Sequence, residues 1–76
     1  MEVFESFLAR LDEEIEKLKG QDQLRVKAFL APIVFHATLK EKGVAHVLEE
    51  SVRNELAFRI VKKAVLDVMT ETVRSV

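Results

Sequence analysis

Cysteine is absent from this sequence, so neither disulfides nor thiolate metal sites can support the fold. The chain is also short, with 76 residues. Domains of this size usually depend on disulfides, on metals or on self-association. Because self-association is the remaining common support, we expect one domain over residues 1–76 that pairs with itself or with a partner.

Tyrosine and tryptophan are also missing, and only two glycines occur. Two isolated glycines cannot form a Gly-rich phosphate-binding loop. None of the serines, at Ser6, Ser51 and Ser75, lies in the Gly-x-Ser-x-Gly turn of a hydrolase nucleophile. The sequence therefore predicts a protein that is not an enzyme and that carries no cofactor.

Long apolar runs are missing as well. The longest uncharged run covers twelve residues, 28–39, whereas a membrane-spanning helix needs about 20. No segment has the order of a secretory signal peptide. We expect a cytoplasmic protein with no membrane contact. The single asparagine and the frequent glutamate and lysine agree with a thermophilic source.

Apolar side chains at alternating steps of four and three predict an amphipathic helix over residues 2–19. These side chains are Phe4, Leu8, Leu11, Ile15 and Leu18. Gly20 is a typical residue to end such a helix. Residues 21–23 then predict a short polar connector, in which Asp22 caps the next helix.

Residues 23–42 allow two interpretations. Residues 24–28 alternate between apolar and charged, which is typical of a short strand. Residues 28–31 and 37–42 are instead good helix formers, and a lone strand would have no partner, so we favour a helix ending at Gly43. Pro32 either kinks this helix or starts a new one. Because the central stretch is apolar nearly all round, it should be buried on most sides.

Residues 44–76 carry the longest pattern. Apolar residues recur at every fourth position from Val44, with Thr72 as the exception. A row with this spacing turns by roughly 40° per step around a helix axis. Either several neighbouring helices cover this row, or the helix is interrupted. We expect the interruption near residues 51–54. The sequence predicts an all-α protein, a small antiparallel bundle of three helices, or four with this break, with a long C-terminal helix.

The apolar surplus lies in the central and last segments, which predicts a homodimer or higher oligomer that also binds another protein. The predicted interface comprises Phe29, Ile33, His36, Phe58, Val61, Val65, Met69 and Val73. Burying an apolar side chain of this size stabilises by about 1.5–3 kcal/mol, so such a set suffices for a dimer. His36 is expected either as a partly buried histidine or as a pH-sensitive interface residue.

A nucleic-acid interface is the alternative. It would use four basic residues around the central segment, namely Arg25, Lys27, Lys40 and Lys42. Gly43 resembles the turn of a helix-turn-helix motif, but the next segment carries Glu49 and Glu50, which repel phosphates. The net charge of −1 also disfavours this function.

A metal carrier is the third alternative. His46, Glu49 and Glu50 place an imidazole and two carboxylates within one helical turn. Half of a carboxylate metal site has a similar composition, but the order here is reversed and the second half is missing. A surface pair between His46 and Glu50 is the simpler interpretation. We therefore expect no metal site.

Overall fold

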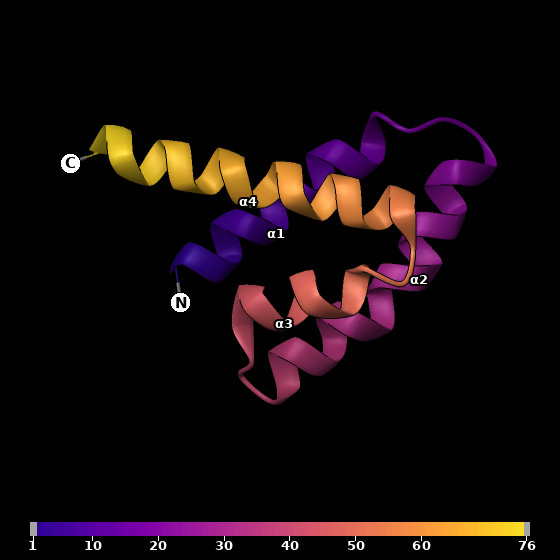
Figure 1. Cartoon of the computed structure of the whole chain (residues 1–76), viewed down its shortest axis with the longest axis horizontal. Helices are drawn as coiled ribbons and strands as arrows, with labels where there is room; N and C mark the ends of the chain where they lie inside the picture. The colour runs from indigo at the N-terminus through magenta and orange to yellow at the C-terminus, as the bar shows by residue number, and fades with distance from the viewer. Residues whose placement is uncertain (1, 76) are drawn as a thin grey trace.

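The computed structural model describes residues 2–75, which form four α-helices and no strand (Figure 1). They are α1 (Glu2–Glu16), α2 (Gln21–Leu39), α3 (Gly43–Ser51) and α4 (Glu55–Ser75). The predicted all-α class is thereby confirmed, and residues 24–28 are helical. No helix within residues 2–75 is long and apolar enough to cross a membrane.

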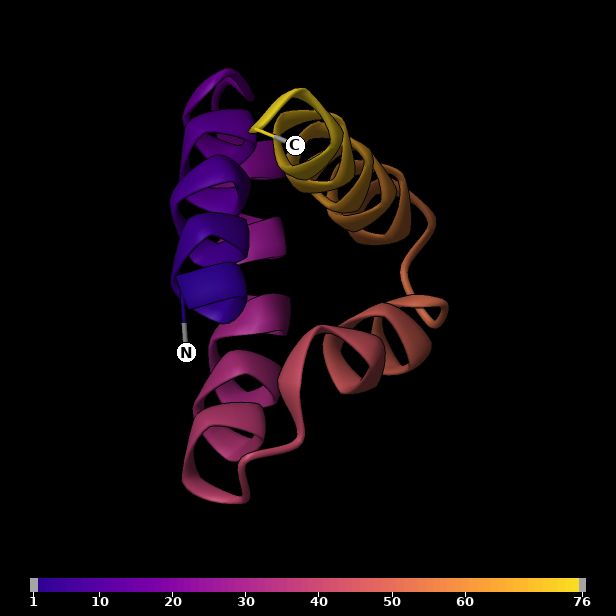
Figure 2. The ribbon, with the colours of Figure 1, turned by 90° about the vertical axis from the view of Figure 1, so that its left-hand side faces the viewer.

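The helices form two layers. Figure 2 shows α1 and α2 on one side and α3 and α4 on the other. The closest packing is between layers, with α1 against α4 and α2 against α3. The fold measures 39 × 27 × 17 Å between Cα atoms, and its shortest dimension leaves room for only two layers of helices. Each helix therefore keeps one face toward solvent.

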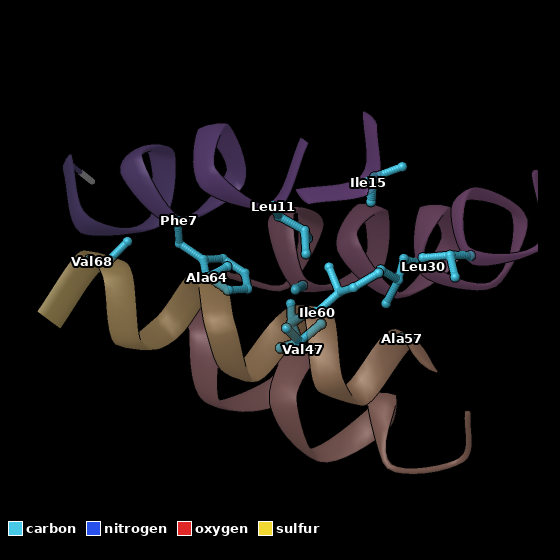
Figure 3. Packing of buried hydrophobic residues seen from close by; sticks show 12 residues of the cluster. Phe7, Leu11, Ile15, Leu30, Val47, Ala57, Ile60, Ala64 and Val68 are labelled. Carbon is cyan, nitrogen blue, oxygen red and sulfur yellow. The ribbon is translucent and has the colours of Figure 1, made fainter. Parts of the chain in front are cut away.

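The core lies between these layers. Phe7, Leu11 and Ile15 extend from α1, and α4 presents Ala57 and Ala64 among its buried residues (Figure 3). The buried apolar residues of this core are Phe7, Leu11, Ile15, Val26, Leu30, Ala37, Val47, Ala57, Ile60, Val61, Ala64 and Val68.

The expected break in the last segment lies between α3 and α4. Ser51 is fully buried, and its Oγ donates a hydrogen bond of 2.7 Å to the carbonyl of Leu48. The side-chain Oδ1 of Asn54 accepts a hydrogen bond of 3.1 Å from the backbone N–H of Ala57. Asn54 therefore caps α4 and fixes where it begins.

The junction of α1 and α2 differs from the prediction. Helix α1 ends at Glu16 rather than at residue 19, and α2 already begins at Gln21. Asp22 is not the cap of α2, because it lies within that helix. At this junction the Nε2 of Gln23 shares its two hydrogens among the carbonyls of residues 15, 16 and 18, at 3.3–3.4 Å, and so caps the end of α1. Gly20, at φ 61°, makes the sharp turn between the helices.

Pro32 neither ends α2 nor starts a new helix. A proline within a helix removes the N–H that would bond to the carbonyl four residues earlier, which here belongs to Ala28. Both Pro32 and Ala28 are exposed, so water can satisfy that carbonyl. The helix continues because the lost bond faces solvent.

The end of α2 also differs from the prediction. Glu41, not Gly43, holds the left-handed position, with φ 53°. The N–H groups of Glu41 and Lys42 bond to the carbonyls of Thr38 and Ala37 at 3.3 and 2.9 Å. This pair of bonds is the Schellman motif that usually carries glycine at its left-handed residue. Gly43, with φ 77°, is instead the first residue of α3.

Candidate interaction surface and histidine pair

The outer face of α2 carries an exposed apolar stripe. Its residues are spaced four, three, four and four apart, so they lie along one side of the helix. They are Leu24, Ala28, Ala31, Phe35 and Leu39, which we term the α2 stripe. Leu24, Phe35 and Leu39 are 65%, 66% and 63% exposed. The buried residues Val26, Leu30 and Ala37 occupy the opposite face, so α2 is apolar on two sides.

An apolar groove runs beside this stripe, between α1 and α2, with a volume of about 380 Å³. The lining residues are Leu8, Leu11, Asp12, Ile15, Lys27, Leu30, Ala31 and Val34. We term it the α1–α2 groove. Ala31 belongs to both features, which makes the groove and the stripe one continuous surface. Asp12 and Lys27 give its rim charges of both signs.

The predicted interface residues fall into three groups in the structure. Val61 is fully buried in the core. Phe29, Ile33 and Val65 are half-buried and pack against that core. Phe58 is half-buried. His36, Met69 and Val73 are exposed. The sequence pattern missed Leu24, Phe35 and Leu39, although the spacing 24, 28, 31, 35 was a readable signal of a second apolar face.

The two histidines, which the sequence pattern treated separately, lie next to each other. The ring centroids of His36 on α2 and His46 on α3 are 5.2 Å apart, and the rings are tilted by 42°. They line a pocket of about 370 Å³ together with Pro32, Ile33 and Glu50. Both residues are five positions from Glu41, so the reversal of the chain at the α2–α3 turn brings them together. Their equal distance from the turn was the available signal.

The carboxylates near His46 have other neighbours. Glu50 forms an ion pair with Arg53, at 3.6 Å between Oε1 and Nη2. Glu49 is exposed. Within residues 2–75, no group of three or more His, Asp or Glu side chains is placed to hold a metal ion. Protein ligands near the histidine pair are therefore limited to the two imidazoles.

The four basic residues of the alternative function lie apart from one another. Arg25 and Lys27 are near the start of α2, whereas Lys40 and Lys42 flank Glu41 in the turn after it. Lys27 and Lys40 are thirteen positions apart in the chain, which corresponds to about 20 Å along a helix. All four are exposed. They do not form one continuous basic patch.

Ion pairs hold α1 against α4 on the far side of the molecule. Arg10 pairs with Glu71 across the two helices. Glu14 is nearly buried, and its Oε2 lies 3.0 Å from the Nζ of Lys17 and 3.6 Å from that of Lys63. The hydrogen bond with Glu14 raises the pKa of Lys17 above its ordinary value. These contacts join helices, which makes them structural rather than part of a binding site.

The fold and surface together define an all-α protein of two helical layers with a second apolar face on α2. Comparison with protein-family models, with curated proteins and with solved structures gives no significant match. A function for this chain therefore has to be argued from its own residues.

Proposed function

We propose that this chain is a non-enzymatic interaction module that pairs with a second copy of itself and, as a pair, binds another protein. The observation that supports this proposal is the α2 stripe. Three large apolar side chains on one side of α2 are each about two-thirds exposed. Burying such a side chain stabilises by about 1.5–3 kcal/mol, which favours a partner over solvent.

A second copy fits this stripe because the stripe is symmetric along the helix. Leu24 and Phe35 lie equally far from the midpoint between residues 29 and 30, and so do Ala28 and Ala31. In a twofold pairing of two α2 helices running in opposite directions, Leu24 of each copy meets Phe35 of the other. The alanines then meet each other at the centre, where small side chains let the backbones approach. Twofold symmetry is also the commonest form of association.

The charges at the edge of the stripe agree with a protein partner. Asp12 and Lys27 line the same groove, so the rim offers both signs. A second copy can match such a rim with its own lysine and carboxylate. Nucleic acid would need cations alone, and would be repelled by the acidic residues of α1.

The test measures the mass of the full chain in solution by sedimentation and light scattering. The protein is used at about 10–100 micromolar, the range in which modest interfaces form. We expect a dimer for the wild type and a monomer for Phe35→Glu. Leu66→Glu is the matched control, because Leu66 is 61% exposed but lies on α4. That variant should stay dimeric. Circular dichroism of each variant checks that the helices are retained.

The register is tested by exchanging charge. Leu24→Lys alone and Phe35→Glu alone should each give monomers. Combined in one chain, they should restore the dimer, because the introduced ammonium meets the introduced carboxylate twice across the twofold axis. A monomeric wild type, or a dimer unaffected by Phe35→Glu, would refute the proposal. Salt-dependent binding of duplex DNA or RNA that is lost in Arg25→Ala would support a nucleic-acid interface instead.

The finer arrangement and setting are part of the same proposal. We propose that the helices form a small antiparallel bundle, with α4 as its long C-terminal member. The composition, poor in glycine and asparagine, supports a thermophilic source. A cytoplasmic location is part of the same proposal. A thermal unfolding midpoint within the mesophile range of about 45–65 °C would contradict the thermophilic source.

A further inference from the structure

The rings of the two histidines are spaced as in a pair that shares one cation. Imidazoles that bind one Zn²⁺ through nitrogens at about 2.0 Å in tetrahedral geometry have ring centroids roughly 5 Å apart. The centroids of His36 and His46 are 5.2 Å apart. We propose that these two histidines form a binding site for a divalent transition-metal ion such as Zn²⁺ or Ni²⁺.

The surroundings of the pair suit a hydrated ion. The pocket that both rings line has a volume of about 370 Å³. An ion with several waters fits in this space, since each water occupies roughly 30 Å³. The rings are tilted by 42° rather than parallel, and both line the pocket.

One carboxylate lies beside the pocket. Glu50, one turn after His46, lines it. Because this carboxylate pairs with Arg53, much of its charge is offset, and the two imidazoles are the ligands that hold the ion. Water completes the coordination shell, because residues 2–75 offer no third side chain within reach. Such an open site binds more weakly than a structural zinc site with four protein ligands.

The identity of the ligands selects the class of metal. Neutral imidazole nitrogen suits zinc, copper and nickel, whereas magnesium and calcium prefer oxygen ligands. Because His36 lies on α2 and His46 on α3, one ion bound by both would link the two helices across their turn. An ion that binds only the folded chain raises its stability by mass action. The site should therefore be visible as a metal-dependent rise in the unfolding temperature.

The experiment uses the full chain, first treated with EDTA and then titrated with Zn²⁺, Ni²⁺ or Mg²⁺ while its thermal unfolding is followed. We expect Zn²⁺ and Ni²⁺ to raise the midpoint and Mg²⁺ to leave it unchanged. His36→Gln and His46→Gln should each abolish the rise. Glu49→Gln is the matched control, since Glu49 is outside the pocket, and should retain the full rise. Glu50→Gln should reduce it.

A second measurement keeps the proposal testable where a variant unfolds. In NMR spectra of the wild type, Zn²⁺ should shift the ring signals of both histidines together, at one ion per chain by native mass spectrometry. An unchanged midpoint in the wild type would overturn the proposal. So would an equal response of wild type and histidine variants, a shift of only one ring, or a stoichiometry of one ion per two chains. Because both histidines belong to one chain, the joint shift of their ring signals is expected for a monomer and for a dimer alike.

Discussion

Replacing Glu41 by glycine should stabilise this protein. Glu41 holds the left-handed position of the Schellman motif at φ 53°, where a residue with a Cβ is crowded against its own carbonyl. That conformation costs an ordinary residue about 1–2 kcal/mol, and glycine adopts it without this cost. Glu41 is exposed, so its removal leaves no cavity.

The net gain is smaller than the strain that is relieved. Glycine makes the unfolded chain more flexible, which lowers stability by roughly 0.5–1 kcal/mol. We therefore expect Glu41→Gly to raise the free energy of unfolding by about 0.5–1 kcal/mol. For a domain of this size, that corresponds to a rise in thermal midpoint of about 2–8 °C.

Urea unfolding followed by circular dichroism measures this change. Wild type and variant must be compared at one protein concentration, because self-association makes stability depend on concentration. Gly43→Ala is the control: Gly43 has φ 77° and open space at its Cβ position, so this change should instead destabilise by about 1 kcal/mol through the backbone alone. Equal or lower stability of Glu41→Gly would show that the strain at this turn is not as described.

Two further changes probe the helix ends and the ion pairs. Asn54→Ala removes the side-chain cap of α4 and should lower the free energy of unfolding by about 1 kcal/mol. Asn54→Asp can still cap the helix and should keep most of the wild-type stability. Glu14→Gln removes the carboxylate shared by Lys17 and Lys63. Because both lysines are more than half exposed, the loss should be about 1 kcal/mol or less and should shrink as salt is added. A loss that is independent of salt would contradict the electrostatic explanation.

Features with a strong local cause could be predicted from the sequence. The four-residue row of the last segment predicts both the helices and a buried face, and its members Ile60 and Ala64 do lie in the core. The drift of that row around the axis predicts the interruption that Ser51 and Asn54 form. In each case the residues that decide the structure are neighbours in the chain.

Features decided by distant contacts could not be predicted. Gln23 caps carbonyls at the end of α1, and a polar residue in a connector gives no sign of this. Glu41 holds a position that glycine usually takes, because the packing of α3 on α2 fixes the turn. The position of Val61 in the sequence pattern is compatible with an exposed face of α4 or with a buried one. Only the packing of the other helices shows that it is buried.

The histidine pair illustrates the same limit for the candidate site. His36 and His46 lie in different helices, and each alone matches the pattern of an ordinary surface or interface residue. Their proximity follows from where the α2–α3 turn reverses the chain. The α2 stripe, by contrast, was present in the spacing of Leu24, Ala28, Ala31 and Phe35, but the apolar residues on the other side of α2 obscured it.

Pro32 also bears on how long two copies would stay together. It leaves the carbonyl of Ala28 without its helical partner, and Ala28 lies at the centre of the α2 stripe. Desolvating that carbonyl in an interface would cost about 1–3 kcal/mol unless a water molecule stays bound to it. Such a cost weakens a complex by roughly one to two orders of magnitude. The proline therefore favours pairs that separate and re-form over permanent ones.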